Sequence, residues 1–271
     1  MEQVDYINNH VQTIETLIKN HDEDVTQYLD LDSYSKRYLI DELTLNFDSG
    51  ITSMYFYKHR NNNILYSGPI WDYDTAMGSM YSHYDNEKWI NTSETISTQG
   101  LPWTKDLLTM DIFHKYVNDN YPLFRSQLKT ILEKELDNWA SQIETSVYLD
   151  NIRWRNIENK SDSFKYYGHY RDYQSNIEYL KFFLASRINY LDTLLCYKGE
   201  PINYSTNDDV HVVEFIIDGN VAYTQNIVHG ESIRTLPSFD EEIASGWYLQ
   251  PRNERYSQYL PILEDTTLIL R

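Results

Sequence analysis

The chain has 271 residues, of which 41% are hydrophobic and 24% are charged, a composition typical of a globular protein rather than a disordered one. Its formal net charge is −18, which argues against nucleic acid or an anionic membrane as a partner because no basic surface could outweigh it. No stretch approaches the run of about 18 apolar residues that a membrane helix requires, and no apolar segment follows Met1. We therefore expect neither a membrane span nor a signal peptide within this chain. The single cysteine, Cys196, is expected to be buried and can form no intrachain disulfide.

Two helices are predicted before residue 48. Apolar side chains recur at three- and four-residue spacing over residues 2–19, which is typical of an amphipathic helix. A second helix is predicted to begin near Ser33, with Asp32 or Ser33 as its N-cap, and to end close to Asp48.

A β-hairpin is predicted after this helix. Residues 51–59 and 64–70 are rich in Ile, Tyr and other residues that favour strands, and an Asn-rich turn separates them. Because a hairpin returns the chain to the end at which it started, we expect Asp48 and Asp72 to lie at the same end. Two carboxylates brought together in this way form a candidate metal or acid/base site.

The region after the hairpin is predicted to be mostly helical. A polar stretch, residues 79–100, is interpreted as a long loop. Helices are then predicted at 107–118, from Tyr121 onward with Pro122 in the first turn, at 151–159 and at 171–197. The helix that starts at Tyr121 is expected to bury an apolar stripe, which consists of Leu123, Phe124, Leu128, Ile131, Leu132, Leu136, Trp139 and Ile143.

The composition changes after residue 200. A polar linker covers 201–209, and short β-rich runs follow at 210–217, 221–228 and 266–270. The Asp218-Gly219 turn between the first two runs is a strong hairpin signal. We therefore expect an α+β fold with a domain boundary near residue 205, separating a helical domain, 1–205, from a β domain, 206–271.

Three interpretations of Asp48, Asp72 and Asp74 remain open from the residues alone. In phosphoryl transfer, one carboxylate orients the acceptor hydroxyl and another holds the Mg²⁺ that bridges the nucleotide phosphates. Glycoside hydrolysis also uses paired carboxylates. A purely structural role is the third interpretation, because Asp residues commonly form turns and cap helices.

Three motifs over these residues resemble the CotH kinase family, the spore-coat protein H-like kinases, and the resemblance extends over about residues 1–197. The motifs are Glu42-xxx-Asn46-x-Asp48, Ser53-x-Tyr55-x-Tyr57-Lys58 and Gly68-Pro69-Ile70-Trp71-Asp72-Tyr73-Asp74. The resemblance implies a mainly helical atypical-kinase C-lobe with a small β-hairpin that carries the catalytic-type aspartates. It also implies transfer of a phosphoryl group from ATP to a protein hydroxyl, with Mg²⁺ or Mn²⁺ as the metal.

The resemblance also implies roles for individual residues. Asp48 matches the catalytic aspartate, Asp72 matches the metal-binding aspartate, and Asp74 is a second metal ligand. Ser53 stands where a kinase catalytic loop carries a metal-binding Asn, and Asn46 is expected to compensate in the cofactor site. Glu42 is expected to be a buried structural acid.

The segment before Asp48 differs from a complete kinase. Its helical pattern includes no β-rich N-lobe, and no Gly-x-Gly pair occurs in the sequence. We therefore expect the chain to correspond to the C-lobe portion and to bind ATP weakly or not at all by itself. The alternative is a non-catalytic binding or adhesion protein of the bacterial surface that retains the kinase scaffold.

Residues 208–271 resemble the Listeria–Bacteroides repeat, a small β-grasp-like module of bacterial surface proteins. The matching residues include Val213-Glu214-Phe215, Gly246-Trp247-Tyr248 and Asp265-Thr266-Thr267-Leu268. The two resemblances together imply a secreted, cell-surface or spore-associated bacterial protein that acts on a protein substrate or a surface partner. Trp247 is expected to be a core residue.

Overall fold

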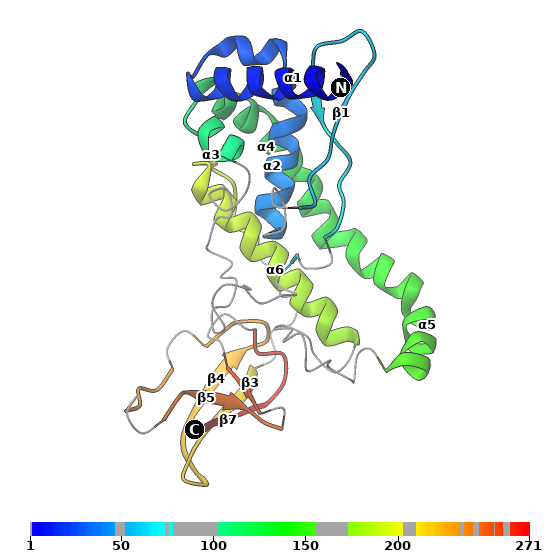
Figure 1. Cartoon of the computed structure of the whole chain (residues 1–271). Helices are drawn as coiled ribbons and strands as arrows, with labels where there is room; N and C mark the ends of the chain where they lie inside the picture. Colours follow the sequence, from blue (N-terminus) through cyan, green and yellow to red (C-terminus); the bar gives the residue numbers. More distant parts are fainter. Residues whose placement is uncertain are drawn as a thin grey trace. The chain divides into compact units, whose positions relative to one another are not determined.

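The structure is a computed structural model that describes residues 2–46, 52–73, 76–77, 102–155, 173–202, 210–233, 236–240, 244–251, 253–256 and 261–271. It is an α+β protein with several long helices and two small sheets (Figure 1), which confirms the predicted fold class. Its contacts divide the chain into two compact units. The first contains the described residues of Met1–Met80, Ser93–Ile131 and Arg187–Glu200, and the second contains those of Tyr81–Thr92, Leu132–Ser186 and Pro201–Arg271. The predicted boundary near residue 205 falls outside the described residues and stays a prediction.

Helices α1, Glu2–Lys19, and α2, Leu31–Thr44, begin the first unit, and a short 3₁₀ helix, η1, Glu23–Gln27, lies between them. Both α-helices were predicted, but the predicted N-cap of α2 is wrong. The cap is Asp30, whose side chain accepts a hydrogen bond from the Ser33 main-chain N–H at 2.7 Å. Capping there satisfies an otherwise unpaired N–H group in the first turn.

The predicted hairpin consists of β1, Phe56–Lys58, and β2, Leu65–Ser67, which pair antiparallel with Phe56 opposite Ser67 and Lys58 opposite Leu65. Its strands are shorter than predicted. The Gly68 N–H donates to the Tyr55 carbonyl at 2.7 Å, and this close approach requires glycine. A Cβ atom on residue 68 would lie 2.6 Å from the Tyr55 oxygen.

The prediction of two separate helices, one at 107–118 and one from Tyr121 onward, is wrong. Helix α3, Pro102–Leu107, ends where the first was predicted to begin, and α4, Asp111–Thr130, runs through Pro122. Four buried side chains at four-residue spacing hold α4 in place: Phe113, Val117, Tyr121 and Arg125. Their packing outweighs the hydrogen bond that Pro122 cannot donate.

Helix α4 continues through a π-helical turn, Ile131–Glu135, into α5, Leu136–Trp154, in the second unit. The predicted apolar stripe is only partly correct, because Leu132 and Leu136 are buried whereas Leu123, Trp139 and Ile143 are exposed. No separate helix begins at residue 151, since residues 151–154 are the last turn of α5.

Helix α6, Tyr173–Leu194, was predicted, and its C-terminal end belongs to the first unit. In the second unit the Lys181 amine lies 2.6 Å from the Asp137 carboxylate of α5. Cys196, after α6, is exposed, so its predicted burial is wrong. Among the helices of the described residues, none combines the length and the apolar character needed to cross a membrane.

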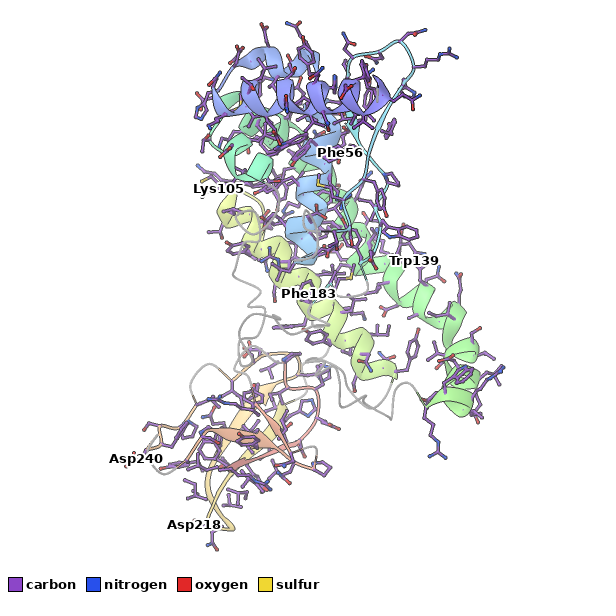
Figure 2. The ribbon with its side chains drawn as sticks, in the orientation of Figure 1. Phe56, Lys105, Trp139, Phe183, Asp218 and Asp240 are labelled. Atoms are coloured by element: carbon purple, nitrogen blue, oxygen red, sulfur yellow. The ribbon has the colours of Figure 1, made fainter. Side chains whose placement is uncertain are left out.

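The described residues of 210–271, which belong to the second unit, form one five-stranded sheet in the order β4-β3-β7-β5-β6. Its strands are β3, Val210–Ile217; β4, Asn220–Val228; β5, Trp247–Leu249; β6, Glu254–Arg255; and β7, Thr266–Leu270. Only the β3–β7 pair of this sheet is parallel. Asp218 and Gly219 both have positive φ, as the predicted tight turn requires, and Figure 2 shows Asp218 at the tip of this hairpin. Trp247 is buried against Phe215 in the core.

Candidate functional site

The structure describes three of the five predicted site residues. Asp48 and Asp74 lie outside the described residues, so their predicted roles stay predictions. Asn46, Ser53 and Asp72 are described, and all three lie in the first unit, at the end of α2 and at the open end of the hairpin.

Ser53 and Asp72 are brought together by the hairpin. Ser53 precedes β1 and is buried, and its Oγ donates to Asp72 Oδ2, which follows β2, at 3.2 Å. Asp72 is exposed and has a φ of 65°, a left-handed conformation that Asp tolerates better than most residues. The contact therefore orients a solvent-facing carboxylate at the open end of the hairpin.

Asn46 lies just beyond the C-terminus of α2. The helix ends at Thr44, its C-cap Leu45 has a φ of 50°, and the Asn46 N–H donates to the Asp41 carbonyl at 3.2 Å. The Asn46 side chain is fully buried, and its Oδ1 atom has no hydrogen-bond partner among the described residues. Buried amides are nearly always paired, so Asn46 offers an oxygen ligand that the described side chains leave unused.

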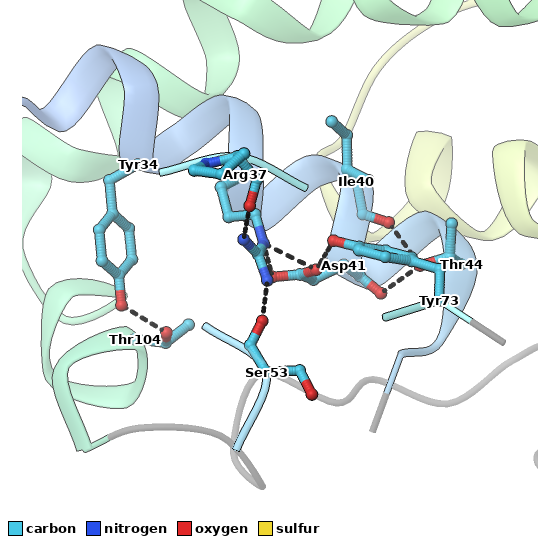
Figure 3. Close-up of polar contacts among 9 residues, drawn as sticks. Tyr34, Arg37, Ile40, Asp41, Thr44, Ser53, Tyr73 and Thr104 are labelled. Carbon is cyan, nitrogen blue, oxygen red and sulfur yellow. Dashed lines mark hydrogen bonds and ion pairs between the residues drawn. The ribbon is translucent and has the colours of Figure 1, made fainter. Parts of the chain in front are cut away.

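A buried ion pair on α2 contacts both chain segments at the open end of the hairpin (Figure 3). Arg37 Nε lies 2.9 Å from Asp41 Oδ2 and 3.1 Å from Oδ1. The same guanidinium donates to the Ser53 carbonyl at 3.4 Å and to the Pro69 carbonyl at 3.5 Å. Arg37 therefore contacts the chain just before β1 and just after β2, on the two sides of the Ser53–Asp72 contact.

Tyr73 completes this buried network. Its hydroxyl donates to Asp41 Oδ1, and the Arg37 guanidinium lies 5.8 Å from the centre of its ring. Burial raises the pKa of Tyr73, and the negative charge and hydrogen bond of Asp41 raise it further. A side-chain hydrogen bond with Asn46 opposes part of this rise in pKa. Tyr73 therefore stays neutral and fixes the backbone next to Asp72.

Glu42 is fully buried, as expected. Arg187 of α6 is also fully buried, and its Nη2 atom lies 3.7 Å from Glu42 Oε2. Arg187 Nε donates to the Glu42 main-chain carbonyl at 3.1 Å. This pair anchors the last turn of α2, one turn before Asn46.

The oxygen atoms of these residues fit a Mg²⁺ or Mn²⁺ ion. Mg²⁺ is bound in nucleotide sites by one or two carboxylates, together with phosphate oxygens and water. Asp72 supplies an exposed carboxylate, and Asn46 has an unpaired amide oxygen. Within the part of the chain that the structure describes, no three His, Cys, Asp or Glu side chains form a metal-binding group, and the two further candidate carboxylates, Asp48 and Asp74, lie outside that part.

Sequence reasoning did not identify Arg37, Asp41 and Tyr73. Arg37 and Asp41 are four residues apart on a predicted helix, a spacing that indicates an ion pair. Nothing in the sequence shows that this pair also contacts the hairpin, because those contacts depend on the tertiary fold.

Comparison with known proteins identifies the family. The family model described as CotH kinase protein matches residues 1–191, which include all five predicted site residues. Neither the curated proteins nor the solved structures provide a match. Because the matched segment covers well over half of its length, this chain belongs to the CotH kinase protein family.

Proposed function

We propose that this protein is a kinase that transfers the terminal phosphoryl group of ATP to a hydroxyl group of a protein. The family membership supports a kinase-like protein. The observation that carries the proposal is the Ser53–Asp72 hydrogen bond, which holds one exposed carboxylate at the open end of the hairpin.

In this proposal the chain's own residues have distinct tasks. Asp72 holds the metal, Ser53 fixes the orientation of the carboxylate, and Asn46 offers a further oxygen. Asp48 orients the acceptor hydroxyl and receives its proton, and Asp74 is a second metal ligand. When bound, the metal ion neutralises the charge that develops on the transferred phosphate.

The buried network gives the site its rigidity. Arg37 and Asp41 are both largely removed from solvent, and Arg37 also donates to carbonyls on both sides of the Ser53–Asp72 contact. Residues locked in this way hold a catalytic group within a small distance of its productive position. Arg37, Asp41 and Tyr73 are therefore positioning residues.

The test compares two aspartates in the same backbone conformation. Asp72 and Asp218 are both exposed and both have positive φ, a conformation in which Asn is well tolerated. In the full-length protein, with Mg²⁺ or Mn²⁺, radiolabelled ATP and casein as the acceptor, Asp72→Asn should lower phosphoryl transfer at least about a hundredfold. Asp218→Asn should leave the transfer unchanged.

Metal binding can be measured without any turnover. Mn²⁺ binding followed by electron paramagnetic resonance should weaken in Asp72→Asn and persist in Asp218→Asn. Transfer at the wild-type rate by Asp72→Asn would show that Asp72 does not hold the catalytic metal.

An exposed aromatic cluster favours a second function, non-catalytic binding at a bacterial surface. Tyr55, Tyr57 and Trp71 are all exposed on or beside the hairpin, and Tyr55 packs edge-on against Trp71 at 6.3 Å. Exposed aromatic side chains are common in binding surfaces. If Mn²⁺ binds but no phosphoryl transfer occurs, this second function is favoured.

We also propose that the β domain is a Listeria–Bacteroides repeat-like, β-grasp-like module and that the protein acts outside the cell or on the spore. The mixed sheet, in which β3 pairs in parallel with the last strand, and the buried Trp247 support the module. Protease treatment of intact cells or spores should remove the protein if it is exposed on their surface.

A further inference from the structure

A groove of about 580 Å³ lies between α1 and the hairpin in the first unit. Its main lining residues are Tyr6, Ile7, His10, Phe56, Lys58 and Trp103. Figure 1 shows β1 next to the N-terminal end of α1, and Figure 2 marks Phe56 there. Ser53 and Asp72 do not line the groove, although Met54 does, and the groove has no task in the proposed phosphoryl transfer.

One border of the groove is the unpaired edge of β1. In an antiparallel pair, residues alternate between those bonded to the partner strand and those directed away from it. The Gly68 N–H bonds to the Tyr55 carbonyl, so the alternation directs the N–H and C=O groups of Phe56 and Lys58 away from β2. Leu65, opposite Lys58, likewise bonds away from β1, to the main chain of Tyr28 and Asp30.

These main-chain groups of β1 have no partner among the described residues. The sheet contains only β1 and β2, and no other described strand approaches β1. Phe56 and Lys58 share one face of the hairpin, whereas Tyr57, on the opposite face, also lines the groove. The groove therefore reaches the edge of β1, where an added strand would bond.

His10 lines the groove and carries an unsatisfied nitrogen behind its wall. Its Nε2 atom is buried and has no hydrogen-bond partner among the described residues. Burial lowers the pKa of His10, the positive charge of Lys58 lowers it further, and the Tyr28 main chain opposes part of the change. A neutral imidazole with its proton on Nδ1 has a lone pair at Nε2, and a ligand hydroxyl can donate to it once the ring turns toward the groove.

The hairpin end of the groove is positively charged. Lys58 lines the groove, and Arg60 follows in the exposed turn, within a chain whose net charge is −18. The one acidic residue that lines the groove, Glu15, accepts a hydrogen bond from Trp103 at 3.3 Å. This charge favours an acidic residue of a ligand beside Lys58.

We propose that the groove binds an extended acidic peptide that adds as a third strand to β1. The peptide inserts a tyrosine between the aromatic walls, donates its hydroxyl hydrogen bond to His10, and pairs a carboxylate with Lys58. This binding stands whether or not the chain transfers phosphoryl groups.

The test uses a fluorescein-labelled peptide, Thr-Val-Tyr-Val-Glu-Glu, and fluorescence anisotropy with the whole chain. Two further peptides carry N-methyl groups on alternate sets of amides. Because only alternate N–H groups of an added strand bond to β1, one set should abolish binding and the other should leave it nearly unchanged. Equal binding of both sets, or no binding of the unmethylated peptide, would overturn the proposal.

Two protein variants locate the peptide in the groove. Ile7 and Val4 are exposed to nearly the same extent on α1, at 58% and 59%, but only Ile7 lines the groove. Ile7→Gln should weaken binding about fivefold, and Val4→Gln should not. Lys58→Glu should weaken the acidic peptide about tenfold and improve binding of a peptide with Lys in place of Glu. If Ile7→Gln and Val4→Gln weaken peptide binding equally, the peptide binds outside the groove. The same follows if Lys58→Glu does not change the preference for acidic over basic peptides.

Discussion

Arg37 is the residue on which the geometry of the candidate site depends most directly. It is buried beside Asp41 and donates to carbonyls on both sides of the hairpin. A buried charge pair contributes little by itself because desolvation offsets the attraction between the charges. Its value here is positional, since one guanidinium fixes the spacing of two chain segments that are far apart in the sequence.

The Tyr73 hydroxyl offers a mild way to test this network. Tyr73→Phe removes the hydrogen bond to Asp41 and keeps the ring beside Arg37. Because hydrogen bonds to charged groups contribute about 1.5–3 kcal/mol, we expect the free energy of unfolding to fall by about 2 kcal/mol in urea denaturation.

Tyr57 provides the matched control for this prediction. It lies on the same hairpin and is exposed, so Tyr57→Phe should change the free energy of unfolding by less than about 0.5 kcal/mol. Phosphoryl transfer should also decrease in Tyr73→Phe if the network positions Asp72. Equal unfolding free energies for the two variants would show that the Asp41 contact contributes nothing.

At the scale of elements, α4 and the end of α6 are joined by a second buried network in the first unit. Arg125 and Asp192 form a two-point ion pair at 2.7–2.9 Å, and the Tyr121 hydroxyl donates to Asp192 at 2.8 Å. Arg125 also donates to the Glu200 carbonyl at 2.6 Å, and Asp192 raises the pKa of Arg125. The network thus fastens the chain that follows α6 to α4.

Asp192→Ala should be strongly destabilising. It leaves the Arg125 charge buried without its partner, so the free energy of unfolding should fall by about 3–5 kcal/mol. The control is Asp119→Ala on α4, the helix that carries Arg125, which breaks the exposed Lys115–Asp119 pair and should cost less than about 0.5 kcal/mol. Chemical denaturation of both variants measures the difference in their free energies of unfolding. Similar decreases in the two variants would contradict a buried role for Asp192.

Elements specified by local signals were predictable from the sequence. Helix α1 follows from its apolar spacing, and the β3–β4 hairpin follows from Asp218-Gly219, whose positive φ values the structure confirms. Pro122 misled the prediction, because packing of Tyr121 and Arg125 keeps the helix intact across it. Of the candidate site, the sequence indicated Ser53 and Asp72, but the contacts of Arg37 with the hairpin depend on the tertiary fold.

At the scale of the whole molecule, buried tyrosines occur in both units. Complete or partial burial is the largest cause that raises the pKa of six tyrosines, of which Tyr73 and Tyr179 are half-buried: Tyr34, Tyr38, Tyr73, Tyr121, Tyr179 and Tyr256. In the unfolded chain each would lose its proton near pH 10. The folded chain therefore holds more protons than the unfolded chain above this pH.

This difference predicts alkaline unfolding. The stabilisation that the protonated, buried tyrosines give the folded chain is fully present below about pH 10. It is lost as the pH rises above about 10, because hydroxide then removes tyrosine protons only from the unfolded chain. Each buried tyrosine should steepen the decline of the unfolding free energy by about 1.4 kcal/mol per pH unit. Tyrosinate absorbance should rise first from exposed tyrosines without loss of circular dichroism. A second rise in tyrosinate absorbance, from the buried tyrosines, should coincide with the loss of circular dichroism.

Removing one buried hydroxyl tests this mechanism. Tyr38 is buried and packs edge-on against Phe113, and Tyr38→Phe keeps the ring, so the decline of the unfolding free energy above pH 10 should become shallower by about 1.4 kcal/mol per pH unit. Tyr148→Phe, at an exposed position of α5, should leave the slope unchanged. Added salt screens the repulsion of the net negative charge. If Tyr38→Phe still has a shallower slope of unfolding free energy against pH in added salt, the difference is caused by the buried hydroxyl. Ionisation of all 25 tyrosines without loss of circular dichroism would contradict this account.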